Sequence, residues 1–316
     1  MAVVDAIRLN WLDGINKSSG ARVWGTDKFF AQKSITVNSY SPGSINVFLA
    51  NASTGVNYFA HEADRFAAAA FESLLTPAKS ERLPRSYGWQ LIQAYYSAFF
   101  AAHALFRIGG WACARLNSGH LKNINSEVKT LFGGASLPGG IYLIKGTSGG
   151  SSLSIEHLGG QGGGSHEALW SVFPTYLAHI RNIVIAQTAV STQDIQPIER
   201  LDDFLRFKGG GEWFSTVRNR LNYSHAYGAW HPYIKSTTPH EQVNLAINSW
   251  LETIDIFEYS RQSDEMIQFA KACAGIVALC RTAIEDLALR SSAKSPFRGS
   301  SYQLISEAKN IKTKKH

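Results

Sequence analysis

Apolar residues recur at helical spacing over most of the chain after residue 57. Within Tyr58–Leu75 they follow a three-and-four spacing, which predicts a helix with one buried face. The next predicted helix, Tyr87–Ile108, is apolar on nearly every side. That pattern is typical of a helix at the centre of a bundle. Further helices are predicted at Glu167–Ala189 with a kink or break at Pro174, and at Ile198–Phe207, Glu212–His225, near Pro239 and Asp264–Arg290.

Two regions have a different pattern. Residues 1–57 combine β-branched and aromatic residues with turn signals, which predicts strands at Ser34–Tyr40 and Ile45–Ala50. Residues 109–165 hold 15 of the 27 glycines, and short strands are predicted there at Ile141–Ile144 and Ser152–His157. The predicted fold class is mainly α, with a β-containing N-terminal region over 1–57 and a helical domain over 58–291. This domain carries a glycine-rich, partly β insertion at about 109–165, and a basic C-terminal tail follows over 292–316.

Composition and charge narrow the function only slightly. In 316 residues, 45% are hydrophobic and 17% charged, which excludes wholesale disorder. The net charge of +7 suggests an anionic partner such as nucleic acid. However, residues 294–316 hold six basic residues and one acidic residue, so +5 of that charge lies in the tail. A mobile tail of this kind is expected to add affinity for RNA that does not depend on base sequence.

Three cysteines, Cys113, Cys273 and Cys280, provide neither a zinc-ligand spacing nor a disulfide framework, which fits a reducing cytosol. The spacing of Cys273 and Cys280 in an apolar helical segment predicts buried thiols. The start of the chain lacks the pattern of a signal peptide, and no apolar segment is long enough to span a membrane. We therefore expect a cytoplasmic protein that does not enter the membrane and needs no metal or other cofactor.

The segment that suggests chemistry is Glu212–His225. If it forms one helix, His225 lies within about 20° of Arg218 and roughly 10.5 Å further along the axis, and Asn222 shares their face. A guanidinium group suits phosphate and an imidazole exchanges protons near neutral pH. Together they can hold a phosphodiester and move a proton, and RNA supplies its own 2′-hydroxyl nucleophile. The alternative is structural: Arg218 pairs with an acidic residue, and His225 interacts with the C-terminal end of the helix.

This segment resembles the signature of HEPN domains, in which an arginine and a polar residue precede a histidine by a short interval. Here these are Arg218, Asn219 and His225, and the aromatic, alanine-rich segment Gln93–Leu105 resembles an early helix of the same family. The resemblance implies a helical bundle that dimerises to form one composite, metal-independent endoribonuclease site, often in a toxin or antiviral defence protein. It further implies that Arg218 polarises the phosphate, His225 acts as general acid or base, and Asn219 orients the site. A homodimer, an RNA substrate, and an antitoxin or regulatory protein are the partners it implies.

Other candidates are weaker. Asn222 and Tyr223 are candidates for supporting roles, with base stacking as the role of an exposed tyrosine. Gly146–Gly150 matches the serine-hydrolase elbow with Ser148 as nucleophile, but a flexible glycine loop is the preferred interpretation. His103 is predicted to be a hydrogen-bonded core residue, and scattered histidines such as His166 to face solvent or cap helices. The second hypothesis for the whole chain is a catalytically inactive HEPN-like module that binds a partner protein or nucleic acid.

Overall fold

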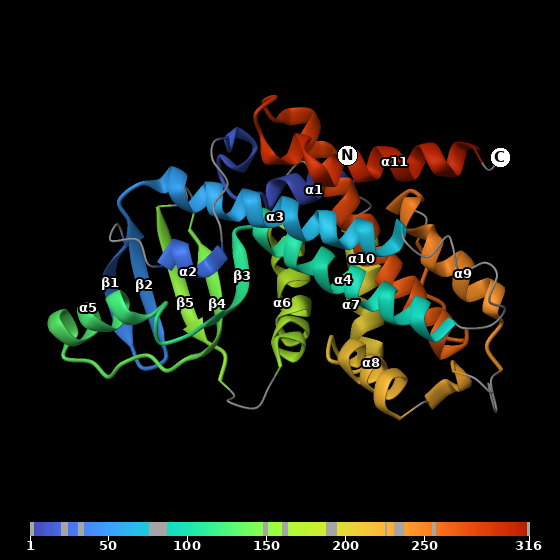
Figure 1. The fold of residues 1–316 in the computed structure, drawn as a ribbon, viewed down its shortest axis with the longest axis horizontal. Helices are drawn as coiled ribbons and strands as arrows, with labels where there is room; N and C mark the ends of the chain where they lie inside the picture. The colour runs from blue at the N-terminus through green and yellow to red at the C-terminus, as the bar shows by residue number, and fades with distance from the viewer. Residues whose placement is uncertain are drawn as a thin grey trace.

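The computed structural model describes residues 3–19, 25–30, 35–75, 87–147, 151–159, 164–187, 195–224, 226–230, 237–254 and 257–314. Its helices are α1 (Val3–Leu9), α2 (Gly25–Phe30), α3 (Ala52–Leu75), α4 (Tyr87–Ile108), α5 (Lys122–Phe132), α6 (Ser165–Ile185), α7 (Gln196–Phe207), α8 (Trp213–Tyr223), α9 (His240–Asn248), α10 (Glu265–Arg290) and α11 (Ser300–Lys314). Its strands are β1 (Ile35–Ser41), β2 (Ser44–Leu49), β3 (Trp111–Leu116), β4 (Gly140–Gly146) and β5 (Ser152–His157). Figure 1 shows the sheet at one end, most helices at the other, and α3 running along both. A mainly helical fold with β segments is confirmed.

The five strands form one antiparallel sheet in the order β1-β2-β5-β4-β3. β1 and β2 are joined by a tight turn in which Gly43 has a φ of 81°, a conformation that glycine adopts without strain. β2 then pairs with β5, placing Val47 opposite Leu153. The four predicted strands are confirmed, whereas β3 and α5 are not predicted from the sequence. The N-terminal region and the glycine-rich insertion therefore build a single sheet.

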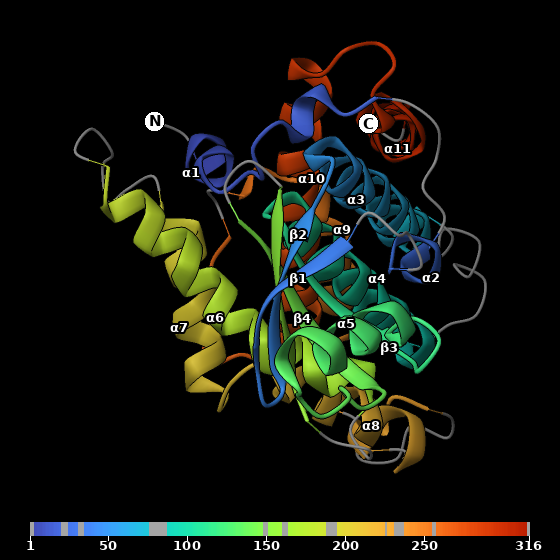
Figure 2. The same ribbon diagram turned by 90° about the vertical axis from the view of Figure 1, so that its left-hand side faces the viewer.

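Helix α4 is the centre of the helical part. It packs against α3 and α10, and it also contacts α6, α8 and α9. Figure 2 places α6 and α7 on one side of this centre and α3 and α11 on the other. The side chains of Tyr95, Leu105 and Phe106 are fully buried, which confirms the position predicted from the apolar pattern of this helix. No helix in the described part of the chain is long and apolar enough to cross a membrane.

The helix boundaries differ from the prediction in two informative places. α3 begins at Ala52 rather than Tyr58, because Val56 and other residues before Tyr58 also reach the core. α6 continues through Pro174, so of the predicted kink or break at this residue the break does not occur. The start of α10 follows the prediction, with the Asp264 carboxylate accepting a hydrogen bond from the Met266 amide at 2.8 Å. Cys273 and Cys280 are buried free thiols on α10, as predicted.

The prediction of a mobile tail over residues 292–316 is wrong, because most of this segment forms α11. This helix packs along α3 and buries Ile305 and Ala308. Its start is held by Asp64 of α3, whose carboxylate accepts hydrogen bonds from the Ser301 hydroxyl at 2.5 Å and the Ser301 amide at 3.2 Å. A carboxylate at a helix N-terminus satisfies unpaired amides and complements the helix dipole. Three of the six basic residues of this segment, Lys309, Lys312 and Lys314, therefore belong to a helix.

Candidate functional site

Helix α8 carries the predicted site, and its sequence divides it into two faces. Trp213, Phe214, Val217 and Leu221 are buried at helical spacing, and Phe214 stacks on Trp170 of α6 with ring centroids 4.4 Å apart. The opposite face is polar and solvent-exposed. The apolar face thus fixes the rotation of α8 about its axis, and this rotation determines which polar side chains border the other helices.

The start of α8 lies unusually close to α6. Pro174 has no amide hydrogen, so the Trp170 carbonyl four residues earlier has no partner within the helix. Gly211 lies against that carbonyl: a Cβ at position 211 would clash with the Trp170 oxygen and would lie 3.3 Å from Pro174 Cδ. The absence of a side chain at Gly211 therefore permits the contact that positions α8.

Gly211→Ala is expected to destabilise the protein by about 1–3 kcal/mol, because the added methyl group forces α8 away from α6. Urea unfolding followed by tryptophan fluorescence measures this change. Gly164→Ala is the matched control, since a Cβ there meets nothing within 4 Å, and it should shift stability by less than about 0.5 kcal/mol. Equal stability of the two variants would contradict the close α6–α8 contact.

Arg218 lies at the border between the two faces of α8, where this helix meets α4. Its Nη1 donates a hydrogen bond to Asn219 Oδ1 at 2.7 Å, and its Nη2 donates to the Tyr96 hydroxyl at 3.3 Å. The guanidinium carbon lies 5.6 Å from the ring centroid of Tyr95 and 5.7 Å from that of Tyr96. Two tyrosines of α4 and one residue of α8 therefore hold this cation in place.

The partners that the structure describes for Arg218 are electrically neutral. Among the described residues no carboxylate forms an ion pair with it, and its buried Nε has no hydrogen-bond partner. The structural alternative, in which Arg218 pairs with an acidic side chain, therefore finds no support in the described part of the chain. A half-buried guanidinium without a counter-ion attracts an anion, and its planar donor array suits phosphate.

His166, at the start of α6, lies beside this arginine. Its Nδ1 is 2.9 Å from the Tyr95 hydroxyl, and its ring centroid is 5.6 Å from that of Tyr96. Burial first, and the charge of Arg218 second, lower the pKa of His166 to about 4. The Tyr95 oxygen accepts a hydrogen bond from Trp170 Nε1 at 3.1 Å, so its single proton is available for Nδ1. His166 is therefore neutral at pH 7 and shares a hydrogen bond with Tyr95 through Nδ1.

Sequence reasoning missed His166. It was expected to face solvent or cap a helix, and no local pattern links it to Arg218. The two residues come together only because α6 and α8 both pack on α4. The one sequence signal is its position at the start of a predicted helix, which does not by itself indicate a site.

The other predicted site residues differ in how exposed they are and in whether they contact Arg218. Asn219 is exposed and contacts Arg218, whereas Asn222 is half-buried and Tyr223 is 76% exposed at the end of the helix. α8 ends at Tyr223 with Ser224 as its C-cap, so the single helix predicted through His225 is too long. His225 itself lies outside the described residues, so its predicted place beside Arg218 stays a prediction.

The chain after α8 is held by hydrogen bonds to α8 itself and to the start of α4. Trp230 Nε1 donates a hydrogen bond to the Leu221 carbonyl at 2.8 Å, and the Tyr87 hydroxyl donates to the Tyr227 carbonyl at 3.1 Å. Tyr227 has a φ of 68°, a conformation that costs a non-glycine residue roughly 1 kcal/mol or more. These hydrogen bonds hold the strained backbone in place close to the predicted site.

Two other candidates have different outcomes. Ser148 lies outside the described residues. His103 is buried and its Nδ1 is 3.0 Å from Arg107 Nη1, which confirms the prediction of a hydrogen-bonded core residue. Among the residues that the structure describes, no group of three histidine, cysteine or acidic side chains is placed to hold a metal ion.

Comparison of the chain with family models, curated proteins and solved structures finds no match. The resemblance of α8 to the HEPN signature therefore stays a prediction. The site is interpreted from its own residues: an arginine that has no ion pair within the described ranges, two tyrosines, a neutral histidine and an exposed asparagine.

Proposed function

We propose that the chain is a HEPN-type endoribonuclease that cleaves RNA without a metal ion. The observation that carries this proposal is the state of Arg218, a half-buried cation whose hydrogen-bond partners among the described residues are all neutral. Such a group stabilises the negative charge that develops on a phosphodiester during cleavage. The signature around Arg218 adds the proton-transfer residue that this chemistry requires.

The proposed roles follow from the chemistry of each group. Arg218 binds and polarises the scissile phosphate, and Asn219 holds the guanidinium through its side-chain oxygen. By resemblance to the HEPN signature, His225 is the general acid or base. His166, whose pKa burial and the charge of Arg218 lower to about 4, is neutral and can take part only in hydrogen bonding. The exposed ring of Tyr223 offers a surface on which an RNA base can stack. Two copies of the chain would combine their α8 helices into one composite site.

The test is incubation of the purified protein with single-stranded RNA in EDTA. We expect cleavage products that end in a 2′,3′-cyclic phosphate, and a large loss of activity in His225→Ala. His120→Ala is the control, since His120 lies in the connection between β3 and α5. RNA binding without cleavage would favour the alternative, an inactive HEPN-like module that binds nucleic acid.

A role in defence or as a toxin extends the same proposal. Cleavage of cellular RNA would arrest growth when the chain is expressed, unless an antitoxin or regulatory protein restrains it. Growth arrest that disappears with His225→Ala supports this role.

A further inference from the structure

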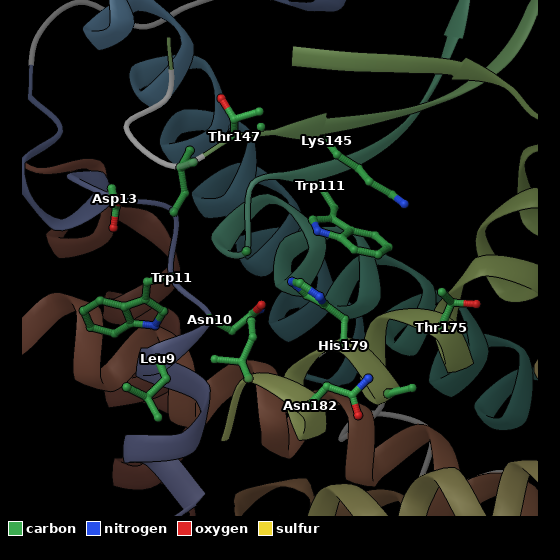
Figure 3. Close-up of a pocket in the computed structure, with 15 residues that line it drawn as sticks. Leu9, Asn10, Trp11, Asp13, Trp111, Lys145, Thr147, Thr175, His179 and Asn182 are labelled. Carbon is green, nitrogen blue, oxygen red and sulfur yellow. The ribbon is translucent and has the colours of Figure 1, made fainter. Parts of the chain in front are cut away.

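A cavity lies between α6, the chain after α1, the start of β3 and the end of β4 (Figure 3). It has a volume of about 760 Å³. This is within the range of small-molecule sites, roughly 300–1,000 Å³. Polar residues from all three elements line it, including Asn10, Asp13, Lys145 and His179. None of these residues takes part in the site around Arg218.

The cavity is lined by a buried acceptor without a hydrogen-bond partner in the described part of the chain. Asn10 is 5% exposed, and its Nδ2 donates a hydrogen bond to the Tyr176 hydroxyl at 2.8 Å. The Tyr176 hydroxyl donates its single proton to the Leu105 carbonyl at 2.5 Å, so it can only accept from Asn10. This chain of hydrogen bonds fixes the orientation of the amide and leaves Asn10 Oδ1 unpaired. An unsatisfied buried acceptor costs about 1–3 kcal/mol, which a ligand that donates a hydrogen bond would recover.

The backbone near Asn10 is shaped to allow this arrangement. A Cβ at Gly109 would lie 2.5 Å from Asn10 Nδ2 and 2.7 Å from the Tyr176 hydroxyl. Glycine at position 109 therefore leaves room for the hydrogen bond that orients the amide. Figure 3 shows the Asn10 side chain directed toward His179 at the middle of the cavity.

Lys145 supplies a positive charge on another wall. Its ammonium group lies 4.3 Å from the ring centroid of Trp111, and no carboxylate among the described residues forms an ion pair with it. His179 packs on the same ring at 5.1 Å, and burial followed by the charge of Lys145 lowers its pKa. The imidazole is therefore neutral at pH 7, and Lys145 is the cation that an anionic ligand would meet.

The end of the cavity away from Lys145 presents hydrogen-bond acceptors instead of a positive charge. Figure 3 places Asp13 and Lys145 on different sides of the cavity, with Asn10 between them. The Asp13 carboxylate and Asn10 Oδ1 are acceptors, so this end suits a group with N–H or O–H donors. The Thr147 and Thr175 hydroxyls also line the walls. A ligand with an anionic group at one end and hydrogen-bond donors at the other matches this arrangement.

We propose that this cavity binds a small organic phosphate, with its phosphate at Lys145 and a donor-bearing end, such as a ribose or an amino-substituted base, at Asn10 and Asp13. Lysine binds phosphate as a compact point charge, and a nucleoside monophosphate is within the size that the cavity accepts. The test of this proposal does not depend on RNA cleavage, because it measures binding without any reaction.

Isothermal titration calorimetry of the full chain with the four ribonucleoside 5′-monophosphates, ribose 5-phosphate and the parent nucleosides tests this proposal. At least one phosphate compound is expected to bind, and its parent nucleoside at least tenfold more weakly. Lys145→Met should weaken binding tenfold or more, whereas Lys122→Met on α5 should not change it. Asn10→Leu should also weaken binding, and its thermal unfolding shows whether the fold is intact.

The proposal is overturned if none of these phosphates binds, or if Lys145→Met binds as tightly as the unchanged protein. Equal affinity for a phosphate and its nucleoside would also overturn it, because Lys145 would then not contact the anion. If Asn10→Leu unfolds, the Lys145→Met result decides. Each outcome is independent of whether the chain cleaves RNA.

Discussion

Arg218→Ala is expected to reduce the rate of RNA cleavage by about 10²–10³-fold. This is the typical loss when one preorganised group that stabilises transition-state charge is removed. Arg218 is well placed for that role, because Asn219 and Tyr96 fix its guanidinium before any substrate binds. The measurement is the initial rate of cleavage of a defined RNA in EDTA, at protein concentrations where the unchanged protein is active.

Two further variants make the result specific. Arg218→Lys keeps the charge but loses the planar donor array, so its rate should lie between those of the unchanged protein and Arg218→Ala. Arg220→Ala removes a charge from the exposed face of the same helix and should leave the rate within about twofold. Wild-type cleavage by Arg218→Ala, or an equal loss in Arg220→Ala, would rule out the proposed site.

The helices were predictable where the sequence pattern is strong and local. The boundaries of α4 agree with the prediction, because its apolar residues surround the helix and the pattern ends at both boundaries. β3 was missed because Trp111–Leu116 is a short, mostly apolar run directly after α4, and periodicity alone does not separate such a strand from a buried helix. α11 was missed because its start depends on Asp64, more than 230 residues earlier in the chain.

The candidate site was likewise predictable only where its residues are close together in the sequence. Arg218 and Asn219 are neighbours on one helix, so their proximity follows from the sequence alone. Tyr96 and His166 reach Arg218 through tertiary packing, and no local spacing encodes that contact. The unpaired Oδ1 of Asn10 also cannot be predicted from the sequence, because it depends on the hydrogen bonds of Tyr176. Helical periodicity shows which face of a helix is buried, but not which distant residues meet it.

The second large effect is expected in the core, where α3 and α4 share a buried ion pair. Glu62 and Arg107 are 3% and 2% exposed, with Glu62 Oε2 accepting from Arg107 Nη2 at 3.3 Å. Tyr58 donates to the same carboxylate oxygen at 3.2 Å, His103 contacts Arg107, and the guanidinium lies 4.9 Å from the Phe66 ring. Arginine keeps its charge even when buried, so removing the carboxylate leaves an uncompensated cation inside the protein.

Glu62→Gln is therefore expected to lower the free energy of unfolding by about 3–5 kcal/mol. Arg65, which also pairs with Glu62, is about half exposed and should be hydrated without large cost. The double variant Glu62→Leu/Arg107→Met removes both charges and should be more stable than Glu62→Gln, since apolar replacements of a buried pair are often nearly neutral. Lys309→Met, which breaks the partly exposed pair with Glu285, is the control and should cost about 1 kcal/mol or less. Urea unfolding of the unchanged protein and the three variants measures these differences. A Glu62→Gln variant as stable as the Lys309→Met control would show that the buried charge of Arg107 is hydrated or compensated by another group.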